Sequence, residues 1–174
     1  MWGEMSGIVV ETEAYDAEGD EACHTFFRPS AREFVSRHEA GAAYIYLNYG
    51  VHWMLNVLVR GDREGFVLVR ALEPVGGLDA MRKRRRQPVD VELCLGPGKL
   101  TRALGIGPEH HGIDLCGDPD HAFFASGPGL RVRATPRIGI TRAVGLKWRF
   151  IAEGNLHVSG PKRKGRVGPK SHPA

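Results

Sequence analysis

The segment AYIYLNYGVHWMLNVLV, residues 43–59, predicts a β-hairpin and decides what kind of sheet the chain builds. Its two apolar runs are rich in the aromatic and branched residues that favour strands. Between them stand Asn48, Tyr49 and Gly50, which are typical of a tight turn because Asn and Gly tolerate positive φ angles. The two runs are residues 43–47 and 51–59. We therefore expect two antiparallel strands with the ring of Tyr49 exposed at the tip.

Hydrophobic periodicity predicts the elements on either side of this hairpin. Polar and apolar side chains alternate over residues 7–15, which places Glu13 and Tyr15 on the same face of a strand. A later apolar strand carries Arg70 in its interior and is expected to end before Pro74. The remaining signals predict helices at residues 32–37, 76–86 and 97–104 and strands at residues 66–72, 131–134 and 137–144. The chain therefore combines strands and helices with many turns.

Length and composition limit the class of protein. The chain has 174 residues, of which 42% are hydrophobic, and this is enough to bury the core of a single domain and excludes intrinsic disorder. The three cysteines form no CxxC pair, so we expect no disulfide scaffold and a reducing cytoplasm. Residues 40–59 are uncharged and long enough to span a membrane, but their Asn, His and Tyr residues are unsuited to hydrocarbon.

Charge is distributed unevenly along the chain, although the net charge is only +4. Residues 1–25 contain seven carboxylates and no Lys or Arg, whereas nine basic residues in 137–174 stand against the single acid Glu153. Residues 82–86 form an unbroken basic block. Such blocks attract polyanions, and the alternative is a solvated helix face with a frayed tail. We expect residues 161–174 to form a basic, disordered tail.

Two short patterns look like ligand sites but lack the required spacing. Four potential zinc ligands lie within 12 residues without a two-residue knuckle, so a polar loop is the better interpretation and we expect no metal. They are His110, His111, Cys116 and His121. The stretch LGPGKL (residues 95–100) resembles a phosphate-binding loop, but Leu93 replaces its first glycine and Leu100 its metal-binding hydroxyl.

One set of residues does suggest chemistry when taken together. Each member alone has an ordinary structural explanation, such as a paired carboxylate or a packed tyrosine. The set consists of Glu11, Glu13, Tyr15, His24, Tyr44, Tyr46, Tyr49, Asn56 and Arg70. Together they predict a pocket with aromatic walls and a carboxylate floor, which suits a flat heterocycle and the activation of a water molecule beside it.

The motifs that contain these residues closely resemble those of the alkyladenine type of 3-methyladenine DNA glycosylase, the methylpurine DNA glycosylase family. The resemblance covers residues 8–159. It is carried by ETEAY (residues 11–15), His24, YIYLNYGVHWMLNV (44–57), VLVRALEP (67–74), ELCLGPGKLTRAL (92–104), RIGI (137–140) and RF (149–150). It implies an α+β fold: one mixed domain, residues 1–160, with a curved, mainly antiparallel sheet and flanking helices.

The resemblance also implies a role for each pocket residue. Glu13 matches the general base that directs water onto the sugar C1′, and Arg70 matches the arginine that holds this water, with the backbone carbonyl of Ile138 as a further contact. Asn56 matches a position that disfavours the exocyclic amine of guanine. The aromatic walls that sandwich the extruded base match Tyr15, His24 and Tyr46.

For the DNA, the resemblance implies that Tyr49 is a wedge that fills the gap left by the extruded nucleotide. Val51 and His52 adjoin this wedge and would brace the duplex. Arg82 and Arg84 are general candidates for phosphate contacts. The implied partner is double-stranded DNA with a damaged purine, and we expect a monomer that uses no cofactor and binds no membrane.

Two other functions stay open, and one departure from the family pattern is visible. The chain would be a non-catalytic DNA-binding module if it bound DNA without releasing a base. It would be a free nucleosidase if Glu11 and Glu13 acted as a carboxylate pair, since two such positions on a strand are roughly 7 Å apart. No lysine falls in the inferred pocket, so lyase chemistry is not expected. Family members carry a helix and a strand before ETEAY, whereas seven residues precede Ile8 here, so we expect an open sheet edge.

Overall fold

A computed structural model describes residues 2–123 and 129–160, so the expected basic tail lies outside the described residues. Within them, six strands form one sheet in the order β2-β3-β4-β1-β6-β5, and every neighbouring pair is antiparallel. The strands are β1 (Ser6–Asp16), β2 (Ala43–Asn48), β3 (His52–Val59), β4 (Gly65–Gly76), β5 (Val132–Thr135) and β6 (Arg149–Ala152). The helices are α1 (His24–Phe27), α2 (Pro29–Arg37), α3 (Leu78–Arg85) and α4 (Pro97–Leu104), with 3₁₀ turns η1 (Asp90–Glu92) and η2 (Pro108–His110). The expected α+β fold is confirmed.

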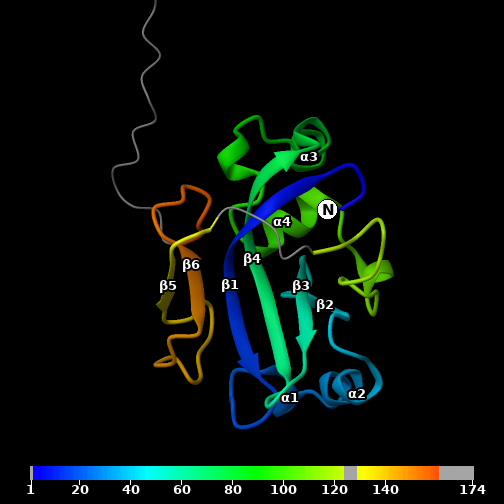
Figure 1. Cartoon of the computed structure of the whole chain (residues 1–174), viewed down its shortest axis with the longest axis vertical. Coiled ribbons are helices and arrows are strands. Elements are labelled where there is room, and N and C mark those ends of the chain that lie inside the picture. Colours follow the sequence, from blue (N-terminus) through cyan, green and yellow to red (C-terminus); the bar gives the residue numbers. More distant parts are fainter. Residues whose placement is uncertain (1, 124–128, 161–174) are drawn as a thin grey trace, which may run out of the picture.

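Strands β1 and β4 run side by side along the long axis of the molecule (Figure 1). Their register shifts at the start of β1, between Ser6 and Gly7, and again near the middle. In the middle, Val9 faces Leu72, Glu11 faces Ala71 and Thr12 faces Val69, so the register passes over Val10 and then over Arg70. Irregularities of this kind turn a side chain away from the direction that simple alternation would give it. This one lies at Arg70, a predicted site residue.

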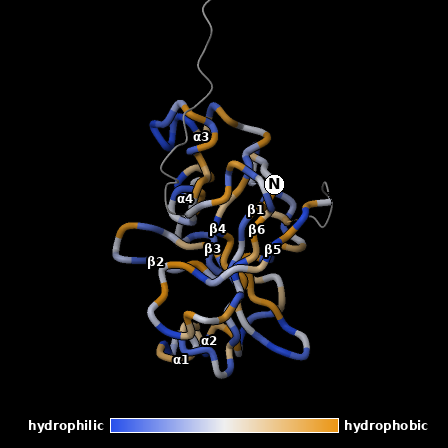
Figure 2. Tube along the Cα trace, turned by 90° about the vertical axis from the view of Figure 1, so that its left-hand side faces the viewer, coloured by the Kyte–Doolittle hydropathy of each residue, from blue (hydrophilic) through white to orange (hydrophobic). Residues whose placement is uncertain are grey.

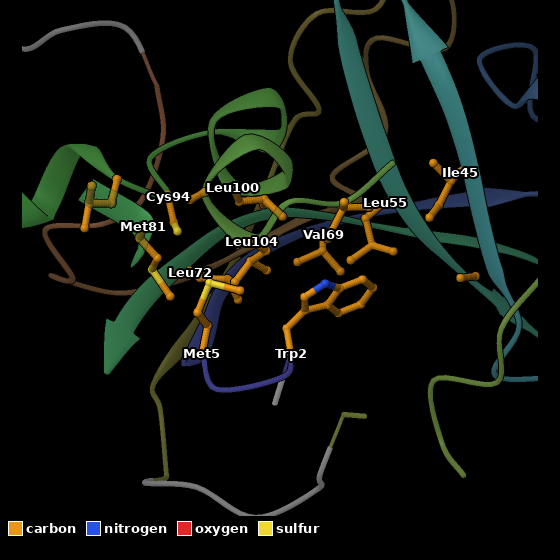
Figure 3. Packing of buried hydrophobic residues seen from close by; sticks show 14 of the residues in the cluster. Trp2, Met5, Ile45, Leu55, Val69, Leu72, Met81, Cys94, Leu100 and Leu104 are labelled. Carbon is orange, nitrogen blue, oxygen red and sulfur yellow. The ribbon is translucent and has the colours of Figure 1, made fainter. Parts of the chain in front are cut away.

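Helices cover the sheet at its two ends, with α3 at one end and α1 and α2 at the other in both views (Figures 1 and 2). The main core forms where α3 and α4 pack on the sheet, and Figure 3 shows Leu100 and Leu104 of α4 close to side chains of β3 and β4. Helix α4 begins with Pro97 at its first turn and ends at Gly105, whose φ is 73°, as the sequence predicted. A second core under α2 contains Phe34, Tyr44, Leu58 and Phe66, among others.

The predicted hairpin is confirmed as β2 and β3, but the positive φ angles fall on Tyr49 (50°) and Gly50 (68°) and not on Asn48. The prediction that β4 ends before Pro74 is wrong, because β4 continues to Gly76. Strand β3 pairs only with residues 65–68 of β4. Pro74 lies beyond this paired stretch, so its missing N–H removes no hydrogen bond between β4 and β3, and the strand can continue through it.

Two other predictions about elements are also wrong. Residues 137–144 form no strand, because Arg137 turns inward and Gly139 and Ala143 take positive φ angles, and the last strand is β6. Helix α2 begins at Pro29 rather than at residue 32, and it follows the unpredicted short helix α1. Strand β1 lies inside the sheet, with β6 beside residues 11–13. Among the described helices, none has the length and apolar content to cross a bilayer.

Candidate active site

Glu13 on β1 is the fully buried centre of a hydrogen-bond network. Its side chain has no exposed surface and accepts three hydrogen bonds from groups far apart in the sequence. The N–H of Ile138 donates to Oε1 at 2.8 Å, while the Tyr15 hydroxyl at 2.8 Å and Arg70 Nη1 at 3.1 Å donate to Oε2. The main chain of Ile138 thus contributes its N–H to the Glu13 carboxylate.

Glu11, two residues earlier, holds the other side of Arg70. Arg70 Nε donates to Glu11 Oε1 at 3.0 Å, and Arg149 Nε donates to the same oxygen at 2.7 Å. The backbone N–H of Ser159 donates to Oε2 at 2.6 Å. Two carboxylates and two guanidinium groups therefore balance in charge, and Arg70 is fixed between Glu11 and Glu13. Of the three donors to Glu11, only Arg70 lines the cavity described next, so the geometry does not support a carboxylate pair made of Glu11 and Glu13.

Beside this network lies a cavity of about 670 Å³, a size typical of a small-molecule site. The predicted residues that line it are Tyr15, His24, Tyr44, Tyr46, Tyr49, Asn56 and Arg70. Glu13 itself is one layer behind the lining, but its three donors, Tyr15, Arg70 and Ile138, all reach the cavity. The structure therefore brings the predicted pocket residues together, with the carboxylate behind them.

The walls of the cavity are held by ring contacts. His24 lies against Tyr46 with 4.2 Å between ring centroids, and its Nδ1 lies 3.1 Å from the hydroxyl of Tyr44. Tyr15 comes from β1, on a different element from both. Asn56 on β3 is buried and donates from Nδ2 to the carbonyl of Tyr44 at 3.1 Å, which fixes its amide at the cavity surface.

These rings are uncharged at neutral pH, and burial widens the pH range over which they stay uncharged. Burial lowers the pKa of His24 to about 4, and the nearby charge of Arg28 adds to this effect. Burial likewise raises the pKa of Tyr46 to about 12. The pKa of Tyr15 is also raised well above its usual value, first by burial and then by the charge of Glu13. The cavity therefore presents neutral aromatic surfaces near one buried carboxylate.

The hairpin tip stands at the edge of the cavity. Tyr49 is 87% exposed and still belongs to the lining, and Val51 beside it is 69% exposed. Tyr49 has a positive φ, which is an unfavourable backbone conformation for a bulky residue. Strained backbone of this kind is often found at functional sites, so it is consistent with a functional role for the exposed ring. His52 is exposed, and its ring lies against Gly98 at the start of α4, where a Cβ would come within 2.7 Å of it.

Comparison with known proteins agrees with this geometry. The family model of methylpurine-DNA glycosylase (MPG) matches residues 1–156. The chain belongs to the methylpurine-DNA glycosylase family. Proteins named "Putative 3-methyladenine DNA glycosylase" are similar to it: the one from Chlorobaculum parvum is 41% identical over 165 residues (90% of this chain, 78% of the relative), and the one from Rubrobacter xylanophilus is 42% identical over 165 residues (93% and 84%).

In this member of the methylpurine-DNA glycosylase family, two arginines of the basic block on α3 are bound by acceptors of the same chain. Arg82 binds Asp90 through Nε and Nη2, both at 2.8 Å, and Asp79 through Nη1 at 2.6 Å. Arg84 Nη1 points to the carbonyls of Ala103 and Leu104 at the end of α4. Both head groups predicted to contact phosphates therefore have acceptors within the chain, and Arg84 is still exposed.

Sequence reasoning missed basic and aromatic residues at the mouth of the cavity. Phe27, about half exposed, and the exposed Arg142 both belong to the lining. Arg28 lies 5.7 Å from the ring centroid of Tyr46 and 5.8 Å from that of Phe27. The triplet FFR at residues 26–28 was a sequence signal for Phe27 and Arg28, and the sequence around Arg142 gave none. In the part of the chain that the structure describes, no group of three or more His, Cys, Asp or Glu residues could hold a metal ion.

Proposed function

We propose that this chain is a DNA base-excision repair enzyme that extrudes alkylated purines of the 3-methyladenine and 7-methylguanine type from duplex DNA and removes them by hydrolysis. The observation that carries the proposal is the Glu13 carboxylate, held by Tyr15, Arg70 and Ile138 behind an aromatic cavity that fits a purine. Membership in the methylpurine-DNA glycosylase family supports the same reaction.

In the proposed reaction Glu13 acts as the general base. A water molecule attacks the sugar C1′ while the bond from C1′ to the purine nitrogen breaks, and the bonding electrons leave with the base. Glu13 takes the proton of the water, and its negative charge stabilises the oxocarbenium-like sugar in a site shielded from solvent. Arg70 holds the carboxylate in place and helps to bind the water. The products are the free base and an abasic site.

Recognition in this proposal depends on ring stacking. Alkylation at N3 or N7 makes a purine cationic, and a cation binds favourably over the faces of electron-rich rings such as Tyr46. His24 does not oppose this, because its low pKa leaves it neutral at physiological pH. Asn56 at the cavity surface would disfavour the exocyclic amine of guanine. The alkylated base is already a good leaving group, so little acid catalysis is needed.

Extrusion is assigned to the hairpin tip. Tyr49 would enter the minor groove and replace the extruded base in the stack, with Val51 and His52 against the duplex, and this contact offsets the few kcal/mol that extrusion costs. Phosphates would be bound near the cavity mouth by Arg28 and Arg142 in preference to Arg82 and Arg84, whose head groups are occupied. In this proposal the cavity, the hairpin tip and the phosphate contacts all belong to one catalytic domain, and the protein acts as a monomer.

Hydrolysis without a lyase step is the expected chemistry. A Schiff base at C1′ would need an amine in the cavity, and the described lining residues include no lysine. The expected product is therefore an intact strand with an abasic site. Borohydride trapping should give no covalent complex between the chain and DNA.

The test is incubation with duplex DNA that contains methylated purines, followed by chromatography of the released bases. Wild-type protein should release 3-methyladenine, and Glu13→Gln should lower the release at least about 100-fold while it still binds the duplex. Glu18→Gln, which changes an exposed carboxylate on the loop after β1, is the matched control and should leave the release unchanged. Binding of DNA by the wild type without any release would instead mark a non-catalytic DNA-binding module.

A further inference from the structure

Asp20 and Arg137 form an ion pair that is closed to solvent and lies behind the cavity. Both side chains have no exposed surface, and Arg137 donates to the two carboxylate oxygens of Asp20 at 2.5 and 2.8 Å. Arg137 also donates to the backbone carbonyl of Ala14 on β1 at 2.9 Å. The pair thus joins the loop after β1 to the loop that precedes β6, two segments 117 residues apart in the sequence.

The position of this pair is not explained by stability alone. Removing two charges from water costs several kcal/mol each, and a well-packed apolar pair of similar volume is often as stable. In addition, Nε of Arg137 is buried without a hydrogen-bond partner among the described residues. The contacts of Arg137 with its neighbours suggest a functional role for this buried guanidinium.

Arg137 touches two of the three groups that bind Glu13. Its guanidinium carbon lies 4.6 Å from the ring centroid of Tyr15, the ring whose hydroxyl donates to Glu13, and 5.3 Å from the ring of Trp148. The next residue along the chain is Ile138, whose N–H donates to the other oxygen of Glu13. One side chain therefore fixes a hydrogen-bond donor to each oxygen of the carboxylate.

We propose that Arg137, held by Asp20, is a positioning residue that sets the orientation of Glu13 through the Tyr15 ring and the Ile138 amide. It touches neither the cavity nor the substrate, since it is absent from the lining. This inference rests on the proposed function, in which Glu13 is the general base. A shift of Glu13 of about 1 Å would be enough to lower the rate of base excision strongly without a matching loss of DNA binding.

Two substitutions separate charge from shape. Arg137→Lys keeps a positive charge for Asp20 but loses the plane that stacks on Tyr15 and the fork that reaches Ala14, whereas Arg137→Met loses the charge as well. The matched controls are Arg60→Lys and Arg60→Met, because Arg60 also donates to backbone carbonyls, of Val35 and His38, and to a carboxylate, of Glu64, away from the cavity lining. Both pairs of variants lose comparable hydrogen bonds.

Three measurements are made on each variant: the single-turnover rate of base excision, the Kd for duplex DNA, and hydrogen exchange of peptides that contain the Ile138 amide. For Arg137→Met we expect a rate at least about 10-fold lower, a Kd within about 3-fold of wild type and faster exchange at Ile138. Arg137→Lys should lower the melting temperature less than Arg137→Met does and should show part of the loss in rate. The Arg60 variants should change only stability.

The outcomes are distinguishable from a failure of the proposed function. If wild-type protein releases no base, the proposed function fails, and exchange at Ile138 alone then decides whether Arg137 positions the loop. If Arg137→Met does not fold, Arg137→Lys decides by the same three measurements. An unchanged excision rate and unchanged exchange at Ile138 in a folded Arg137 variant would overturn the inference, as would an equal loss of rate in the Arg60 variants.

Discussion

Replacing Glu11 by Gln tests the buried charge cluster directly, and it should destabilise the domain by about 3–5 kcal/mol. Gln has nearly the same size as Glu, so the substitution creates no cavity and changes mainly the charge. In the wild type, Glu11 accepts hydrogen bonds from Arg70, Arg149 and the N–H of Ser159, with no surface exposed to water. The variant leaves two guanidinium groups with the single carboxylate of Glu13.

The magnitude follows from which partner is lost. An uncompensated buried charge is the costly outcome, whereas the removal of one charge of each sign restores the balance. We therefore expect the double variant Glu11→Gln/Arg149→Met to lose less stability than the sum of its two single variants, by at least about 1 kcal/mol. For a domain of ordinary stability, about 5–15 kcal/mol, a loss of 3–5 kcal/mol is readily measured.

The assay is urea unfolding at pH 7 of the wild type, both single variants and the double variant, followed by circular dichroism. A loss of less than about 1 kcal/mol for Glu11→Gln would refute the view that the cluster is tightly balanced, and so would strict additivity of the two single variants. Because Glu11 also holds Arg70, base excision by the folded fraction of Glu11→Gln should be slower than in the wild type. An unchanged excision rate would show that Arg70 needs no such anchor.

Three further predictions concern the cavity and its surroundings. Tyr49→Gly should keep or raise the free energy of unfolding, since Gly relieves the positive φ, but should lower excision from duplex DNA more than from single strands; equal losses would exclude a wedge. Burial holds the pKa of His24 at about 4 in the folded protein, whereas it is about 6.5 in the unfolded chain, so the free energy of unfolding should be highest above pH 6.5 and fall as the pH decreases to 4. Because His24 is partly exposed, we expect this loss to be about 1–2 kcal/mol. Urea unfolding of wild type and His24→Gln at several pH values should show the difference between them changing across this range. Arg142→Gln should reduce the slope of log Kd against log salt by about 1, whereas Arg84→Gln should lower the melting temperature and leave the slope unchanged; the reverse pattern would place the DNA on α3.

Local sequence signals were sufficient where the structure depends on near neighbours. Asn48-Tyr49-Gly50 predicted the hairpin, and Pro97 with Gly105 predicted both ends of α4, because turns and helix ends are fixed by a few adjacent residues. Residues 137–144 show the opposite case. They were predicted to form a strand, but Arg137 pairs with Asp20 from the other end of the chain, and this distant contact holds the segment as a loop.

The basic block of residues 82–86 shows the same limit for charge. Counting charges indicated either a surface for polyanions or a solvated helix face, and it did not reveal that Arg82 and Arg84 are bound by acceptors from other segments, Asp90 and the end of α4. Whether a guanidinium faces solvent or caps a helix depends on which segments meet, and the sequence of the block itself does not carry this information. The pocket residues were predictable because a resemblance identified their motifs. The distances and hydrogen bonds between these residues could not be predicted from the sequence.

The arrangement around Glu13 connects these observations. The carboxylate has no exposed surface, and it lies behind a lining to which Tyr15, Arg70 and Ile138 all belong, so a water molecule that reaches it must pass between these three groups. Arg70 is aimed at Glu13 by the register shift between β1 and β4, and it is held from behind by Glu11. Each donor to Glu13 is thus placed by a contact outside the cavity. The proposed hydrolytic step would therefore depend on residues outside the cavity lining, and we expect substitutions at those positions to lower the rate of excision before they weaken the binding of DNA.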